Sequence, residues 1–442
     1  MKIQLSDSFD YKRLLRFSLP SIIMMIFTSI YGVVDGFFVS NFVGKTPFAA
    51  VNLIMPFLMI LGTLGFMFGA GGSALIGKTL GEGDIKRANE YFSLFVYIPA
   101  ACSALMAVLA WVFLPDVSRL LGAEGEMLEN CVLYGRIILL ALPALNLEFA
   151  FSSFCVTAAR PNLALAVSVA AGVTNMVLDA LFVAVLRLGL AGAAAATAMS
   201  QLAGGLLPLL WFARPNPSLL RLGKTRFDVR ALLKVCSNGA SELMSNISMS
   251  LVSMLFNGQL IAYAGEDGVA AYGVLMYVNM IFLSAYIGYS NGTAPVVSFH
   301  FGAQNHAELK NLLRRSLRII GCFALGMVAL AIALAEPLAR LFVGYDAALC
   351  ALTVRAFRIF TFSFPFAGLA IYGSAFFTAL NDGLTSALIS FLRTLVFEIA
   401  AVLLLPLVWG VDGIWASIVV AEAVAAALVA VFLAAKRGKY HY

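Results

Sequence analysis

Charge is what this sequence has least of: Asp, Glu, Lys and Arg make up 12% of the 442 residues, whereas 62% are hydrophobic. A typical soluble domain carries about twice that share of charged side chains. The mean hydropathy of +0.94 is equally far from that of a soluble protein. These values exclude a soluble enzyme or nucleic-acid-binding domain and predict an integral membrane protein.

Cysteine and histidine are also scarce. The six cysteines are scattered with no CxxC pair, which is typical of small apolar packing residues. His300, His306 and His441 fall at the end of a span or in the tail, so no imidazole is expected inside the membrane. The sequence therefore predicts no resident metal and no cofactor, and a membrane-embedded enzyme is the weaker alternative.

Twelve apolar stretches are each long enough to cross about 30 Å of hydrocarbon as a helix. The sequence thus predicts an all-α integral membrane protein with short loops. The expected spans are 14–41, 48–77, 90–114, 132–153, 162–186, 190–212, 232–262, 269–299, 315–339, 352–377, 385–408 and 412–435.

The basic residues predict the orientation. With the N-terminus inside, 21 of the 29 Lys and Arg residues fall in inner segments and 7 in outer ones. This asymmetry predicts that both termini are cytoplasmic in a plasma (inner) membrane. The net charge of +6 then reflects topology and gives no sign of a nucleic-acid partner.

An internal repeat appears when the chain is shifted by 221 residues, half its length. Six spans per repeat is an even number, so the halves share one orientation and relate by a pseudo-two-fold along the membrane normal. We expect a six-helix N-terminal lobe over 1–213, a basic linker over 214–230 and a six-helix C-terminal lobe over 231–442. The pairs that coincide include Gly44 with Gly265, Gly71 with Gly292, Gly81 with Gly302, Gly189 with Gly410 and Gly192 with Gly413.

Asp35 lies near the end of the first span, where a carboxylate is costly unless it faces a cavity or an ion path. By helix rise, Asn175 and Asp179 in span five and Thr197 in span six lie at a similar depth in the outer half. Two desolvated carboxylates with amide and hydroxyl partners form a proton-coupling site, or a sodium site if carbonyl groups contribute. A structural pair of carboxyl groups is the alternative.

The repeat provides a control for this site. Under the 221-residue shift Asn175, Asp179 and Thr197 coincide with Val396, Ala400 and Ile418. Residues needed only for the fold tend to be doubled, so this asymmetry favours a function carried by one half.

The second half has its own intramembrane ionisable residues: Glu242, Arg393, Glu398 and Glu422. An ion pair between Arg393 and a glutamate is one explanation. The other is that Glu242 faces the cavity and attracts a cationic substrate. Glu148, in the inner half of span four, has no obvious partner in the sequence.

Methionine and aromatic side chains crowd spans seven and eight, where they could form an adaptable surface for varied apolar ligands. The alternative for each is ordinary packing or contact with lipid. Around Glu242, the candidate substrate-binding residues are Met244, Met249, Met254, Tyr272, Met276, Tyr277 and Met280.

Several of these features together resemble the multidrug and toxic compound extrusion (MATE) family, most closely its bacterial DNA-damage-inducible type. They are the twelve-span repeat, the "YGVVDGFFV" run around Asp35, the "GKTLGEGD" loop, the Asn175–Asp179 pair and the "GVDGIWAS" segment. The resemblance implies that Asp35, Asn175, Asp179 and Thr197 form a cation site in the N-terminal lobe. It also implies that Glu242 matches an acid used for cation coupling in some members.

The sequence departs from the branch that has an aspartate on span ten, because 357–377 contains Arg358 but no acid. This argues against a sodium site in the C-terminal lobe. The family implies an antiporter that exports amphipathic, often cationic organic compounds in exchange for H⁺ or Na⁺. We expect a monomer surrounded by lipid. Pro20 in the first span is then a candidate hinge.

A flippase for lipid-linked saccharides is the nearest alternative within transport. Its anionic cargo calls for a cationic cavity, whereas the intramembrane acids of this chain outnumber the lone Arg393. The antiporter is therefore the favoured interpretation.

Overall fold

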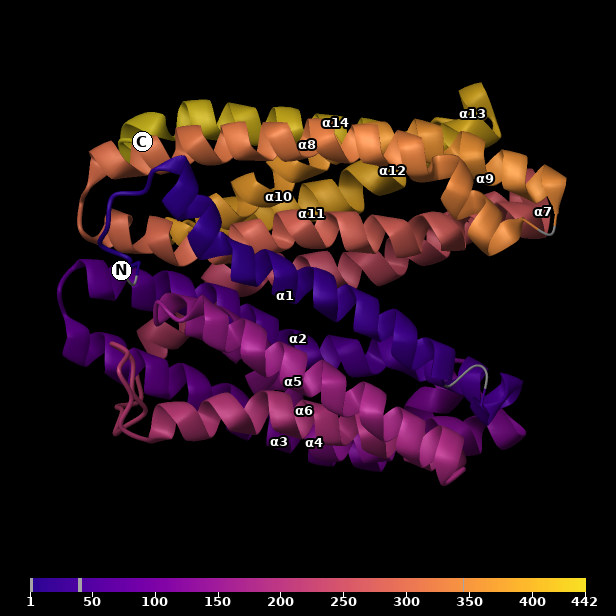
Figure 1. Cartoon of the computed structure of the whole chain (residues 1–442), viewed down its shortest axis with the longest axis horizontal. Coiled ribbons are helices and arrows are strands. Elements are labelled where there is room, and N and C mark those ends of the chain that lie inside the picture. The colour runs from indigo at the N-terminus through magenta and orange to yellow at the C-terminus, as the bar shows by residue number, and fades with distance from the viewer. Residues whose placement is uncertain (1–2, 39–41, 345) are drawn as a thin grey trace.

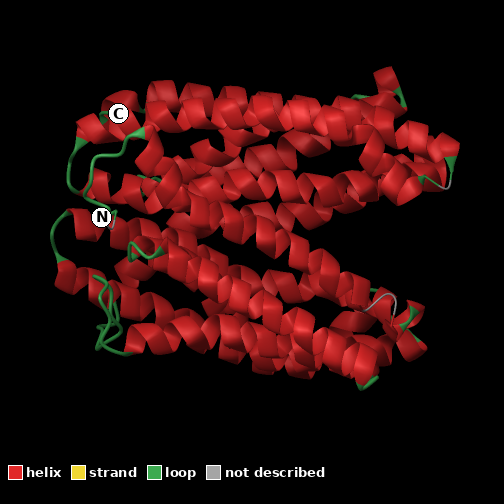
Figure 2. Ribbon diagram, viewed as in Figure 1, coloured by secondary structure: helices red, strands yellow, loops and turns green. Residues whose placement is uncertain are grey.

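The computed structural model describes residues 3–38, 42–344 and 346–442, and, within the helices, not the side chains of 33–38, 45, 250 and 266. In these residues the regular structure is helical (Figure 2). The first half contains α1 (Tyr11–Phe38), α2 (Lys45–Gly81), α3 (Ile85–Leu120), α4 (Gly125–Thr157), α5 (Pro161–Asp179), the π-helix η2 (Ala180–Val185) and α6 (Gly189–Ala213). The second half contains α7 (Val229–Gly302), α8 (His306–Val343), α9 (Ala347–Phe360), the 3₁₀-helix η3 (Thr361–Ser363), α10 (Phe364–Ala379), α11 (Gly383–Phe391), the π-helix η4 (Leu392–Phe397), α12 (Glu398–Leu404), α13 (Pro406–Trp409), α14 (Val411–Ala435) and α15 (Arg437–Tyr440).

Twelve helical stretches of the described chain are long and apolar enough to cross a membrane, so the all-α, twelve-span prediction is confirmed. The long α7 supplies two of them, Val229–Gly265 and Asp267–Gly302. Its chain reverses at Gly265, whose φ of 65° and ψ of −153° are accessible mainly to glycine.

Many helices are longer than hydropathy predicts. The third span begins at Ile85 rather than 90, and the ninth begins at His306 rather than 315. Asp84 and Asn305 cap these helices by accepting the backbone N–H of Arg87 and Glu308. Side-chain caps set where a helix starts, whereas hydropathy detects only its apolar part.

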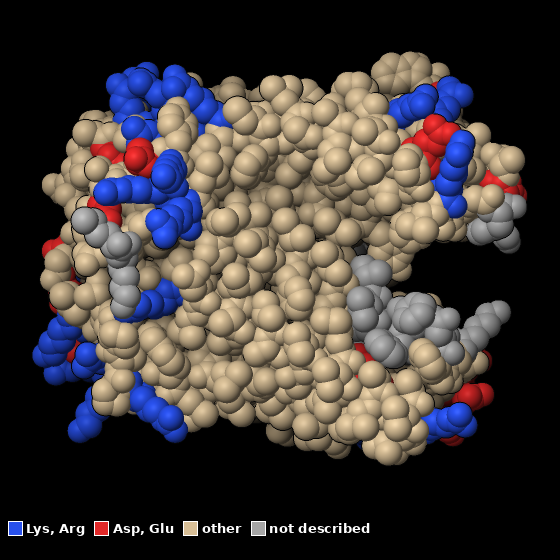
Figure 3. Space-filling model, in the orientation of Figure 1, with Lys and Arg blue, Asp and Glu red and all other residues tan. Residues whose placement is uncertain are grey.

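The helices form two bundles (Figure 1). Helices α2–α6 lie in the lower part of the view and α8–α14 in the upper part, with α1 along the boundary between them. Both chain termini lie at one end, which we call the terminal face; the opposite end is the distal face. Lys and Arg gather at the terminal face, and the molecule is hollowed between its two halves at the distal face (Figure 3).

Toward the terminal face the two halves meet backbone to backbone. A Cβ added to Gly81 in α2 would lie 2.0 Å from the carbonyl oxygen of Phe299, and one added to Gly302 in α7 would lie 1.9 Å from that of Lys78. The two contacts are related by the 221-residue shift, which maps Gly81 on Gly302 and Lys78 on Phe299. Glycine is therefore required on both sides for this close approach.

Candidate transport site

Asn175 and Asp179 lie one turn apart at the distal end of α5, and both are buried, at 2% and 0% exposure. The Nδ2 of Asn175 lies 3.5 Å from the Oγ1 of Thr197 in α6, which itself donates to the Ala193 carbonyl. The hydroxyl of Ser200 donates to the carbonyl of Ala171 and holds α6 against α5. The structure thus brings Asn175 and Thr197 together, with Asp179 one turn away at the start of η2.

Helix α1 packs against the same part of α5. A Cβ on Gly172 would lie 2.6 Å from the Phe27 ring and 3.0 Å from the Tyr31 ring, so α1 approaches where α5 has no side chain. The backbone of α1 continues one turn beyond Tyr31 to Asp35. The Asp35 side chain lies outside the described residues, so its part in the site stays a prediction.

Pro20 lies within α1, which is helical from Tyr11 to Phe38 without a break. Around it α1 touches α7: a Cβ on Gly288 would lie 2.6 Å from the Ile22 Cα, and one on Gly292 would lie 2.9 Å from the Ser18 Cα. The hinge role of Pro20 stays a prediction.

Sequence reasoning left Glu148 open and missed Gln201. The carboxyl group of Glu148 in α4 lies over Gly204 of α6, because a Cβ on Gly204 would be 2.4 Å from its Cδ and 2.7 Å from both its oxygens. Gln201 precedes Gly204 by three residues on α6 and is only 8% exposed. Its Oε1 accepts no hydrogen bond within the described chain. Only the packing of α4 on α6 reveals this arrangement.

In the second half Arg393 holds Glu422 in a bidentate pair. Its Nε lies 3.0 Å and 2.8 Å from the two carboxylate oxygens, and its Nη2 lies 2.7 Å from Oε1. The two side chains are only 14% and 5% exposed. Arg393 belongs to the π-helix η4, which joins α11 to α12.

Glu398 is half-buried and forms no hydrogen bond or ion pair with Arg393 in the described part of the chain, unlike Glu422. Glu242 in α7 is also half-buried. Its backbone carbonyl accepts from the Asn246 side chain, and its carboxyl group forms no ion pair with Arg393 among the described residues.

The methionine and aromatic candidates differ in exposure, and their role in binding substrate stays a prediction. Tyr272 is buried and stacks on Phe256, with ring centroids 5.3 Å apart. By helical register Met249 shares the face of Glu242, whereas Met244 and Met254 point elsewhere. The remaining candidates are half-buried or exposed: Met276, Tyr277 and Met280.

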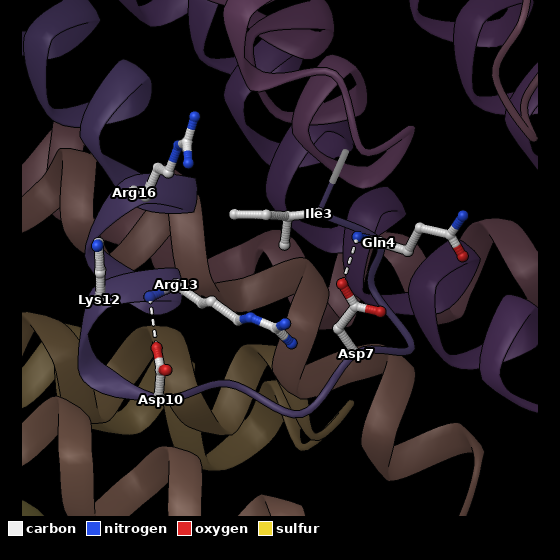
Figure 4. A pocket seen from close by; sticks show the side chains of 7 residues that line it. All are labelled: Ile3, Gln4, Asp7, Asp10, Lys12, Arg13 and Arg16. Atoms are coloured by element: carbon white, nitrogen blue, oxygen red, sulfur yellow. Dashed lines mark hydrogen bonds between the residues drawn. The ribbon is translucent and has the colours of Figure 1, made fainter. Parts of the chain in front are cut away.

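Two surface pockets lie away from these residues. The first is at the terminal face, where the N-terminal segment folds on itself; the backbone N–H of Gln4 donates to Asp7 at 3.1 Å and that of Arg13 to Asp10 at 2.7 Å (Figure 4). Ile3, Lys12 and Arg16 complete it. The second lies between α8, α9 and α14, where Arg355 pairs with Asp412. Both are charged surface features far along the chain from Asn175 and Asp179.

Comparison with known proteins identifies the architecture. The sequence model of the MatE family matches residues 20–181 and 242–405, which is most of the chain. The chain belongs to the MatE family. As a MatE protein it is a multi-pass membrane transporter and not an enzyme.

Relatives and structures of this family span nearly the whole chain. The multidrug export protein MepA of Staphylococcus haemolyticus is 24% identical over 424 residues, which cover 96% of this chain and 93% of MepA. The crystal structure of a MATE protein in complex with MaL6 has a TM-score of 0.93 at 23% identity and covers 98% of each chain. An outward-facing MATE multidrug resistance transporter has a TM-score of 0.89 at 24% identity and covers 99% of this chain and 98% of its own.

Proposed function

We propose that this MatE protein exports amphipathic, often cationic organic compounds in exchange for protons, by alternating access between its two bundles. The observation that carries this proposal is the buried acid Asp179, with Asn175 and Thr197 beside it, in one bundle only. A carboxyl group in such a place titrates between a neutral form suited to burial and a charged form that needs polar partners. That is the property a proton-coupling group requires. Export of drugs by the MepA relatives supports the substrate class.

The ion pair of the second half supports a cationic substrate. Arg393 lies within the eleventh span, and its Nε and Nη2 groups both donate to Glu422. An anionic lipid-linked cargo would have to compete with this pair, whereas Glu242 and Glu398 form no ion pair among the described residues. The flippase alternative is therefore disfavoured.

Alternating access needs a cleft that is open at one face while the other is closed. The hollow at the distal face and the glycine contacts at the terminal face fit an outward-facing state with the termini in the cytoplasm. Glu242 lies about 20 Å above the terminal end of α7 by helix rise, a depth at which a cleft residue could meet substrate.

Reconstituted vesicles test the proposal. We expect an imposed pH gradient to drive uptake of tetraphenylphosphonium into vesicles without added Na⁺. Transport that follows a Na⁺ gradient and ignores the pH gradient would replace the proton by Na⁺. Transport that follows neither would reject cation coupling.

A further inference from the structure

The site around Asp179 needs a route for protons to the terminal face. Asp179 and Asn175 lie about 27 Å and 21 Å above the terminal end of α5 by helix rise. The glycine contacts close the boundary between the bundles below that level. A proton that leaves toward the terminal face must therefore pass through one bundle or wait until the boundary opens.

One face of α6 carries polar groups from this site toward the terminal face. Gln201 follows Thr197 by four residues and Gly204 follows Gln201 by three, so the three share a face over about 10 Å of helix rise. Helix α6 has no ionisable side chain, so any titrating group along this face must come from a neighbouring helix.

Glu148 of α4 is that group. Its carboxyl group lies over the Cα of Gly204, in the space that a side chain would fill. Both helices place it at one height: it lies about 13 Å above the terminal end of α4, and Gly204 lies about 13 Å above that of α6. The agreement puts Glu148 between the Asp179 site and the terminal face.

Gln201 gives an independent reason to expect a polar ligand here. Gln201 is more than nine-tenths buried, at 8% exposure, and its Oε1 accepts from no donor within the described chain. A buried acceptor of this kind is normally satisfied by an ordered water. It lies between Thr197 and Gly204 on the same helix face.

The other helices that pack on α4 supply no ionisable side chain bonded to Glu148. The only ionisable residue of α5 is Asp179, and α2 has none between Thr46 and Gly77. Helix α3 carries Lys86, Arg87 and Glu90 at its terminal end and Asp116 and Arg119 at its distal end, with Tyr91, Tyr97 and Cys102 between. The first half of α7 carries Arg230, Lys234, Cys236, Glu242 and Tyr263. None of these forms a hydrogen bond or ion pair with Glu148 in the described structure.

We propose that Glu148 is the terminal-side proton acceptor of this transporter and that Gln201 holds one water of a chain of waters that links it to the Asp179 site. The inference rests on the proposed proton coupling. The O–H bond of Asp179 breaks and its proton passes to the first water of that chain. Each water passes one of its own protons to the next, and the last water gives the proton that forms the O–H bond of Glu148. Glu148 then releases its proton to water at the terminal face. No electrons are transferred, and the net step moves one proton.

The experiment distinguishes proton-driven transport from the conformational change that carries substrate across the membrane. Full-length wild type and E148Q are reconstituted, and tetraphenylphosphonium movement is followed in two ways: driven by a pH gradient, and as exchange of labelled for unlabelled probe at equal pH. Exchange requires no proton release. We expect E148Q to lose the gradient-driven rate by about tenfold or more and to keep wild-type exchange.

Matched variants sharpen the test. E148D keeps a carboxyl group and should recover part of the driven rate, whereas G204A should lose it because the added methyl group displaces the Glu148 carboxyl group. E336Q removes an exposed acid at the distal face and should behave as wild type. Equal loss of both activities in E148Q, or a wild-type driven rate, would overturn the inference. A wild type that does not respond to the pH gradient would reject the proposed function itself.

Discussion

Asp179 is buried at the residue where α5 changes into the π-helix η2, a change of winding that is frequent at functional sites. The equivalent position in the other half is Ala400, so this acid serves no role that the shared fold requires. Its chemistry, rather than its packing, explains its presence.

The first prediction concerns this acid and Asp35. Asn has nearly the same shape as Asp but cannot exchange a proton, so D179N and D35N should each lower pH-driven transport by about tenfold or more while the protein stays folded. Size-exclusion profiles and vesicle transport measure the two effects. D116N, at an exposed pair with Arg119, is the control. A wild-type rate in D179N would remove this acid from the mechanism.

Asp382 is a structural acid at the terminal face. Its Oδ2 accepts from Lys436 Nζ at 2.6 Å, and its Oδ1 caps α11 through the Thr385 N–H. Burial alone would raise the pKa of Asp382, but hydrogen bonds from Lys436, Tyr440 and Thr385 and the charge of Lys436 lower it by more. The carboxylate therefore ties α11 to the end of α14.

The second prediction follows from that lowered pKa. Because the folded-state pKa is below the unfolded-state value, the stabilisation is complete above the unfolded-state pKa and is lost as pH falls through the folded-state pKa. D382N should cost about 1–2 kcal/mol at pH 7 and flatten the acid limb of the stability curve. Thermal unfolding in detergent as a function of pH measures both. E336Q, in an exposed pair, should cost less than about 0.5 kcal/mol.

At the scale of helices, the contact between α2 and α7 near the terminal face depends on two residues that have no side chain. Gly81 and Gly302 let the two backbones touch. The carbonyl of Ala74 in α2 also accepts from Asn381, whose Oδ1 accepts from Asn238 in α7, so the α10–α11 turn joins the same contact. The proposed alternating access requires these two backbones to separate, so we expect the contact to act as a gate.

The third prediction tests this gate. G81A and G302A should each push α2 from α7 and shift the population toward a state open at the terminal face, because the new Cβ would lie about 2 Å from a carbonyl oxygen. Distances between spin labels on the two bundles measure the shift. G321A, on α8 where nothing lies within 4 Å, is the control and should leave the distances unchanged. Unaltered distances in both gate variants would contradict this account.

At the scale of the whole molecule, the two bundles are related by the sequence repeat but contain different ionisable residues. One contains Asp179 with its amide and hydroxyl neighbours, and the other contains the neutralised Arg393–Glu422 pair with Glu242 and Glu398. The proposed proton coupling requires that a proton in one bundle and substrate in the cleft favour different arrangements of the two bundles.

The fourth prediction is the linkage between these ligands. If they favour different conformations, each must weaken the other's binding by the same factor. Lowering the pH should therefore weaken tetraphenylphosphonium binding, and binding in detergent should release protons into weakly buffered solution. D179N should show neither effect. Affinity that is independent of pH in a preparation that binds the probe would contradict proton coupling.

The sequence by itself determined the membrane setting, the twelve spans and the repeat, because these depend on composition, length and register along the chain. It also indicated the depth of Asn175 and Thr197, since depth is linear in residue number within a helix. The repeated glycines marked positions of special backbone, but not their partners.

Only the tertiary structure decided which residues meet across helices. Glu422 rather than Glu398 pairs with Arg393, Gly81 faces the Phe299 carbonyl, and Glu148 lies over Gly204. Each of these contacts joins segments whose spacing in sequence carries no information about distance. They arise from how the helix faces interlock, and that rotation and packing is fixed by all neighbouring side chains together.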